Sequence, residues 1–81
     1  MARRAARGSN WKRRITSDPR VCHGKPRVEG TRVLVSSILG SLGAGHTREE
    51  VLAGYPAITD KDIDAALAFA AELANGRSVS A

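Results

Sequence analysis

The residues best suited to chemistry lie in one run, VCHGKPRVEGTRVLV at residues 21–35. Two short motifs in it combine a cation with glycine, which adopts backbone conformations that other residues avoid. These motifs are Gly24-Lys25-Pro26 and Gly30-Thr31-Arg32. A phosphate-binding P-loop would need four residues between its glycines and Ser or Thr after the lysine, whereas Pro26 follows Lys25 here. The run therefore indicates a shaped, cationic loop.

Groups that could act as acid, base or nucleophile are few. Cys22 and His23 are neighbours in a segment that we expect to be extended, where adjacent side chains point to opposite faces, so they are poorly placed as a nucleophile–base pair. Asp60 and Asp64 share a helical face, but the helix dipole explains acids near a helix start. A metal site would need more ligands than Cys22, His23 and the distant His46 offer, and His46 stands beside a helix cap. We therefore expect no enzymatic activity, metal or cofactor.

Charge is divided unevenly along the chain, whose net charge is +5. Residues 1–33 carry ten Lys or Arg against two acids, a net charge of +8, whereas residues 34–81 carry three against six, a net charge of −3. A basic front end suggests an acidic partner or nucleic acid. Such a front end could be a flexible arm that enters the DNA minor groove. The candidate DNA-binding residues are Arg3, Arg4, Arg7, Lys12, Arg13 and Arg14. The alternative interpretation is a solvated basic tail.

Length and composition restrict the class of protein. A chain of 81 residues makes one small domain, and it has no apolar tract long enough to span a membrane. No apolar segment follows the basic N-terminus, so we expect no secretory signal. One cysteine excludes an internal disulfide and favours the reducing cytoplasm. A core of this size is marginal alone, so we expect a homodimer or a partner-bound oligomer.

The pattern of apolar, turn and capping residues predicts a mainly α fold, in which an N-terminal β-hairpin precedes a homeodomain-like, helix-turn-helix bundle of three helices. The expected segments are a disordered basic tail at 1–10, a single domain at 11–76 and a loose tail at 77–81. Within the domain we expect the hairpin at 20–34, with its tip at Glu29-Gly30, and helices at 35–44, 47–54 and 59–75.

Capping signals set the starts of the last two helices. Thr47 and Glu50 form the pattern of a capping box, and Thr59 with Asp62 gives the third helix a similar start. The apolar stripe of the third helix is expected to comprise Ile63, Leu67, Ala70 and Ala74. Because this helix is net acidic, DNA phosphates would repel it as a recognition helix.

Several motifs in combination resemble a small bacterial and archaeal family, long described as a domain of unknown function and now associated with VapB-type antitoxins. The resemblance covers about Trp11 to Ala70, and its motifs fall in order as Asp18-Pro19, Gly24-Lys25-Pro26, Gly30-Thr31-Arg32, Glu49-Glu50, Tyr55-Pro56 and Asp62. It implies the homeodomain-like fold with its hairpin and a PIN-like ribonuclease toxin as partner, whose site uses clustered carboxylates on metal. The long basic extension lies at the N-terminus, whereas typical antitoxins carry a long toxin-wrapping C-terminal tail.

Two hypotheses about function follow. In the first, the chain is an antitoxin that inhibits a PIN-like nuclease and also binds operator DNA, with cations such as Lys25 or Arg32 pairing with the nuclease carboxylates. The candidate partner-binding residues are Trp11, Lys25, Arg27, Gly30, Thr31 and Arg32. Trp11 has a second interpretation, favoured here, as a clamp on the domain edge. In the second hypothesis the chain is a stand-alone DNA-binding regulator; an orphan domain that dimerises through its hairpin is the remaining alternative.

Overall fold

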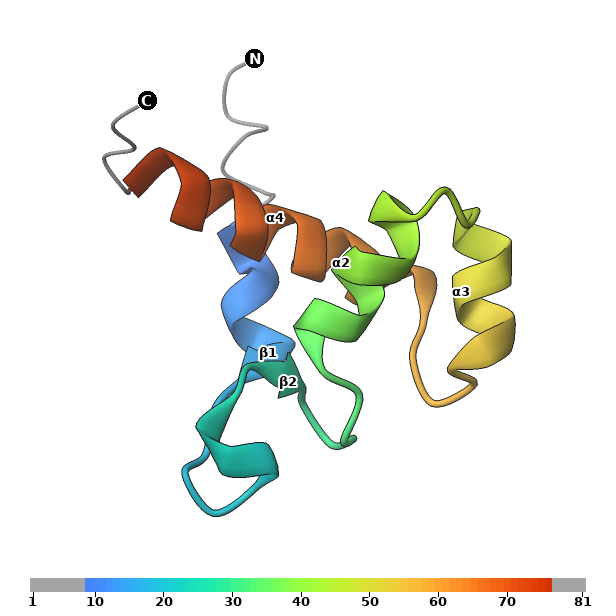
Figure 1. Cartoon of the computed structure of the whole chain (residues 1–81). Helices are drawn as coiled ribbons and strands as arrows, with labels where there is room; N and C mark the ends of the chain where they lie inside the picture. Colours follow the sequence, from blue (N-terminus) through green and yellow to red (C-terminus); the bar gives the residue numbers. More distant parts are fainter. Residues whose placement is uncertain (1–8, 77–81) are drawn as a thin grey trace.

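A computed structural model describes residues 9–76, and within them the predicted fold class is confirmed. A short 3₁₀ helix, η1 (Ser9–Arg13), leads into a two-stranded antiparallel sheet of β1 (Ile15–Thr16) and β2 (Arg27–Val28). Three helices follow, which are α2 (Val35–Gly43), α3 (Arg48–Gly54) and α4 (Asp60–Gly76). Figure 1 shows α4 running along one side of the molecule, with α2 packed beside it and the hairpin and α3 at different ends.

The hairpin begins earlier in the chain than the range 20–34 predicted from sequence. Ile15 pairs with Val28 and Thr16 with Arg27, so the strands enclose the loop 17–26. Ile15 and Val28 are 6% and 2% exposed. This pairing is favoured over a strand starting at residue 20 because it buries both side chains. Apolar burial is the dominant favourable contribution to the free energy of folding.

A second, tighter turn follows β2 and carries the predicted tip at Glu29-Gly30. Arg27 and Leu34 form an isolated antiparallel bridge across it. The Val28 amide donates to the Val33 carbonyl at 2.9 Å, and the Thr31 amide donates to the Val28 carbonyl at 3.0 Å. Gly30 has φ +81°, a left-handed conformation that glycine adopts without steric cost.

The segment around Cys22 is a left-handed turn rather than the extended strand expected from sequence. Cys22, His23 and Gly24 have φ values of 52°, 58° and 78°. Two backbone hydrogen bonds close the turn, from Gly24 N to Val21 O at 3.0 Å and from Lys25 N to Cys22 O at 3.1 Å. Two non-glycine residues in this region store strain, which the closing hydrogen bonds partly offset.

Side-chain caps begin α3 and α4 as the sequence predicts. Thr47 and Glu50 form a complete capping box at α3. At α4 the Thr59 amide donates to Asp62 Oδ2 at 2.9 Å, and the Asp62 amide approaches Thr59 Oγ1 at 3.4 Å. These contacts satisfy amide groups that a helix start otherwise leaves without partners.

The core lies where the hairpin and the three helices meet, and it consists of Ile15, Val28, Val35, Ile38, Val51, Ile58, Ile63, Ala65 and Ala66. The stripe predicted for α4 is rotated in the structure. Ile63 is fully buried, but Leu67 is 42% exposed, and Asp62 is 6% exposed in its place. The inward face of α4 buries Ile63, Ala65 and Ala66, and Asp62 beside them is paired with Arg14.

The predicted tails are only partly within the described chain. Residues 1–8 and 77–81, and with them Arg3, Arg4 and Arg7, lie outside the described residues. Ser9 and Asn10, expected in the tail, begin η1 instead. Over residues 9–76, no helix combines the length and apolar character needed to cross a membrane.

Candidate protein-interaction site

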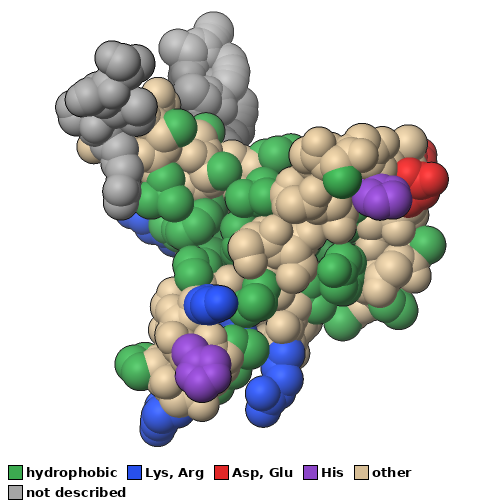
Figure 2. Space-filling view, viewed as in Figure 1, with side chains coloured by type: hydrophobic (Ala, Val, Ile, Leu, Met, Phe, Trp, Pro, Cys, Tyr) green, Lys and Arg blue, Asp and Glu red, His purple; other side chains and the backbone are tan. Residues whose placement is uncertain are grey.

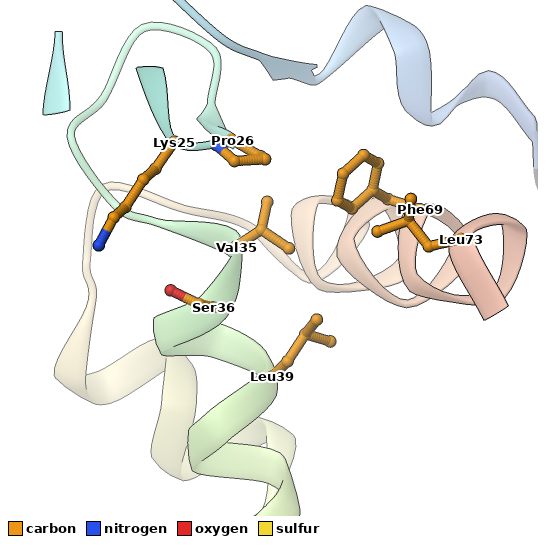
Figure 3. Close-up of a pocket in the computed structure, with 7 residues that line it drawn as sticks. All are labelled: Lys25, Pro26, Val35, Ser36, Leu39, Phe69 and Leu73. Carbon is orange, nitrogen blue, oxygen red and sulfur yellow. The ribbon is translucent and has the colours of Figure 1, made fainter. Parts of the chain in front are cut away.

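An open groove lies between the first turns of α2 and the last turns of α4, and we call it the α2–α4 groove. Its volume is about 340 Å³, and it is lined by Lys25, Pro26, Val35, Ser36, Leu39, Phe69 and Leu73. Figure 3 shows the apolar side chains converging between the two helices, with the Lys25 amine and the Ser36 hydroxyl at one end. The surface is therefore apolar in its middle and cationic at one edge.

Backbone pairing brings the Lys25-Pro26 segment to this groove. The Val35 amide, at the start of α2, donates to the Pro26 carbonyl at 3.0 Å. Pro26 fixes its own φ and has no amide to satisfy, so it can cover the start of α2 as an apolar wall. Because the left-handed turn at 22–24 precedes it directly, the position of Lys25 is set by the loop and not by contacts of its own side chain.

On α4, the groove is formed by residues one helical turn apart, Phe69 and Leu73. The Phe69 ring packs edge to face against Trp11, with the ring centroids 4.9 Å apart and the planes at 76°. Trp11 therefore clamps η1 onto the domain, as the favoured interpretation predicted. Leu73 is 47% exposed, which leaves an apolar side chain accessible at the open end of the groove.

The candidate partner-binding residues of the loops divide into two groups. Thr31 and Arg27 hold the tight turn together, because Thr31 Oγ1 donates to Val28 O at 2.8 Å and Arg27 Nη1 donates to Thr31 O at 3.0 Å. Gly30 supplies the left-handed conformation that this turn needs. Lys25 and Arg32 are exposed, and among residues 9–76 neither forms an ion pair.

The candidate DNA-arm residues within the described chain also differ from one another. Lys12 and Arg13 are exposed, and Lys12 Nζ lies 5.8 Å from the centre of the Trp11 ring. Arg14 instead donates from Nη1 to Asp62 Oδ1 at 3.1 Å, and the Asp62 side chain is only 9% exposed. Arg14 thus ties η1 to the capped start of α4.

Arg48 forms a brace between α3 and α4 that was not predicted from the sequence. Its guanidinium donates to Asp60 Oδ1 and Asp64 Oδ1 at 2.8 and 2.7 Å. The hydrogen bond from Arg48 lowers the pKa of the Asp60 carboxyl, and the two carboxylates raise the pKa of Arg48. The acids at the start of α4 therefore have a partner besides the helix dipole. The spacing of Asp60 and Asp64 at i and i+4 was the available signal.

Two further acids have lowered pKa values for local reasons. The Thr47 amide and then His46 lower the pKa of the Glu50 carboxyl, with His46 Nδ1 lying 3.4 Å from Glu50 Oε1. The Arg20 guanidinium and backbone amide lower the pKa of Asp18. Within the described residues, no group of three or more His, Cys, Asp or Glu side chains is arranged to hold a metal ion.

Charged side chains are unevenly distributed over the face of the molecule shown in Figure 2. In the space-filling view of Figure 2, Lys and Arg gather at the hairpin end of the visible face, whereas the acids lie at the opposite edge near α3. The α2–α4 groove and the exposed loop cations Lys25 and Arg32 therefore present an apolar and cationic surface. Such a surface suits a partner that is itself apolar and acidic.

Comparisons with known proteins agree with this fold. A family model described as "Protein of unknown function (DUF433)" matches residues 15–70. The uncharacterized protein y4eO of Sinorhizobium fredii is 38% identical over 56 residues, which are 69% of this chain and 25% of that protein. This chain thus matches only a quarter of the length of that curated relative. The crystal structure of a DUF433 member protein from Anabaena variabilis superposes with a TM-score of 0.71 at 25% identity, covering 93% of this chain and 78% of that chain.

Proposed function

Because this chain belongs to the DUF433 family of unknown function, we propose its role from its own surface: it is an antitoxin that binds and inhibits a PIN-like ribonuclease. The observation that carries the proposal is the pair of loop cations, Lys25 and Arg32, which are exposed and form no ion pair among residues 9–76. The resemblance to VapB-type antitoxins supplies the class of partner.

Clustered carboxylates are the groups that such a nuclease would offer. A guanidinium or ammonium group pairs with them through charge-assisted hydrogen bonds, which are stronger than neutral ones. The turn that carries Arg32 is held by the hydrogen bonds of Thr31, so the backbone loses little freedom on binding. The Gly30-Thr31-Arg32 motif thus acts as a preformed support for one cation, and Gly24-Lys25-Pro26 supports the other.

The test begins with the genes that flank this chain, among which the proposal requires a PIN-like nuclease, and continues with an inhibition assay of that nuclease on a fluorescent RNA substrate. We expect the wild-type chain to inhibit cleavage and the Lys25→Glu/Arg32→Glu double variant to lose inhibition. Lys61→Glu is the control, because Lys61 is an exposed cation on α4, away from the loops. If the double variant inhibits as well as Lys61→Glu does, the proposed mechanism is wrong.

A stand-alone DNA-binding role is the alternative, and the exposure of Lys12 and Arg13 on η1 favours it. The acids on α4 oppose its use as a recognition helix, since phosphates repel it. This alternative predicts an affinity for any DNA duplex that falls steeply with salt and weakens when Lys12 and Arg13 are both replaced by alanine, a change that keeps Trp11 and Arg14. DNA binding that does not depend on salt, or no binding, would exclude it.

A further inference from the structure

We propose that the α2–α4 groove is the docking site for a short amphipathic segment of the partner protein, with a bulky apolar side chain seated between Leu39 and Phe69 and a carboxylate beside Lys25. This inference rests on the proposed function for the partner being a protein. It adds an apolar contact surface beside Lys25, the loop cation that the groove and the proposed function share.

The groove leaves apolar surface in contact with water. Leu39 and Phe69 are only partly buried, and Leu73 is 47% exposed. Covering apolar surface of this kind is favourable in proportion to its area. A volume of about 340 Å³ is at the small end of the ~300–1,000 Å³ range of ligand pockets, so it holds a few side chains of one segment. Helix-in-groove recognition uses surfaces of this type, with apolar anchors spaced along one helix face.

The groove is also positively charged at one edge. Lys25 is the one charged residue in the lining, and among the described residues its amine forms no ion pair. The tight turn after β2 adds the exposed cation Arg32, whereas the Arg20 guanidinium is already paired with Asp18 at 3.1 Å. A segment with acidic residues beside its apolar anchors is attracted, whereas a basic segment with the same anchors is repelled. Charge therefore selects an acidic amphipathic segment as the occupant.

The experiment compares two synthetic helical peptides with the same leucine face, one with glutamates and one with lysines on the opposite face. Titration calorimetry on the full chain measures each affinity. Tryptophan emission reports the place of binding, because Trp11 is the only tryptophan and packs on Phe69 in the groove wall. We expect saturable binding of the acidic peptide with a change in emission, and weaker binding of the basic peptide. Equal binding of both, or of neither, would overturn the proposal.

Two variants locate the contact. Leu73→Glu should weaken the acidic peptide about tenfold, the loss expected when one half-exposed leucine is no longer buried. Leu67→Glu is the matched control on the same helix, because Leu67 is 42% exposed but lies outside the groove. Lys25→Glu should weaken the acidic peptide about two- to fivefold and reverse the preference between the peptides. Equal effects of Leu73→Glu and Leu67→Glu would contradict the assignment.

The oligomeric state tests the main competing occupant. If the free chain sediments as a dimer that Leu73→Glu dissociates and Leu67→Glu does not, a second copy fills the groove and the proposal is wrong. The outcome is also separable from the proposed function. Loss of peptide binding in Leu73→Glu with nuclease inhibition unchanged would refute the groove as the toxin contact and leave the role of the loop cations standing.

Discussion

Replacing Asp62 with alanine should destabilise the domain far more than removing any fully exposed acid. The Asp62 carboxylate is nearly buried, and it accepts hydrogen bonds from the Thr59 amide at 2.9 Å and from Arg14 Nη1 at 3.1 Å. It therefore joins two parts of the chain that are 48 residues apart. Without it, the Thr59 amide loses its side-chain acceptor at the start of α4, and η1 loses its ionic link to the core.

The magnitude follows from these two contacts. Losing the hydrogen bond between the Thr59 amide and the Asp62 carboxylate costs about 1 kcal/mol. The ion pair adds at most about 1 kcal/mol, because the Arg14 side chain is 43% exposed and water screens it. The sum is about 2 kcal/mol, which lowers the melting temperature of a domain this small by roughly 8–16 °C. Total stability for a domain of this length is roughly 3–10 kcal/mol, so the variant remains folded enough to measure.

Urea unfolding followed by circular dichroism at pH 7 measures the change in the free energy of unfolding. Glu72→Ala is the control, because Glu72 is exposed and unpaired among the described residues, and it should change stability by less than about 0.5 kcal/mol. A double-mutant cycle with Arg14→Met should give a coupling of up to about 1 kcal/mol. An effect of Asp62→Ala no larger than that of Glu72→Ala would refute the described start of α4. Zero coupling energy would show that Arg14 does not pair with Asp62 and would favour its interpretation as part of the flexible DNA-binding arm.

Further stability predictions concern the core, one turn and the acidic brace. Ile63→Ala should cost about 2–5 kcal/mol in urea unfolding because Ile63 is fully buried, whereas Leu67→Ala should cost under about 1 kcal/mol; similar values would contradict the rotated stripe of α4. Gly30→Ala should cost about 1 kcal/mol for its left-handed backbone alone, since an added Cβ meets no atom within 4 Å. Asp60 has a pKa below its ordinary value of 3.8, so its contribution is present above that pH and is lost as the pH falls through the lower folded value. Melting temperatures from pH 5 to pH 2 should therefore fall less steeply in Arg48→Met than in the wild type, and parallel curves would exclude the brace.

The helices were predictable from sequence because their signals are local. Each helix start is marked by a pair of residues three positions apart, Thr47 with Glu50 for α3 and Thr59 with Asp62 for α4. In the structure, α3 and α4 begin directly after the two threonines. The strand pairing was not predictable in the same way. Ile15 pairs with Val28 across a loop, and the run of valines after residue 20 gave a competing local pattern.

Neither the orientation of α4 nor the α2–α4 groove could be predicted from the sequence, because both depend on contacts between residues that are remote in the chain. Spacing alone placed Leu67 inside and treated Asp62 as a cap, since the partner Arg14 is remote in sequence. The side chains of Leu39, Phe69 and Leu73 have the spacing of a core face, and only the packed helices show that they line an open groove. Lys25 was identified as a partner-binding candidate from its glycine and proline neighbours.

Purification of the tagged chain from its native cells, followed by mass spectrometry of whatever co-purifies, tests the central claim most directly. We expect a PIN-like nuclease in stoichiometric amount, which is lost from the Lys25→Glu/Arg32→Glu variant and kept by Lys61→Glu. Recovery of the chain alone, or with nucleic acid that salt removes, would contradict the antitoxin role and favour the DNA-binding regulator.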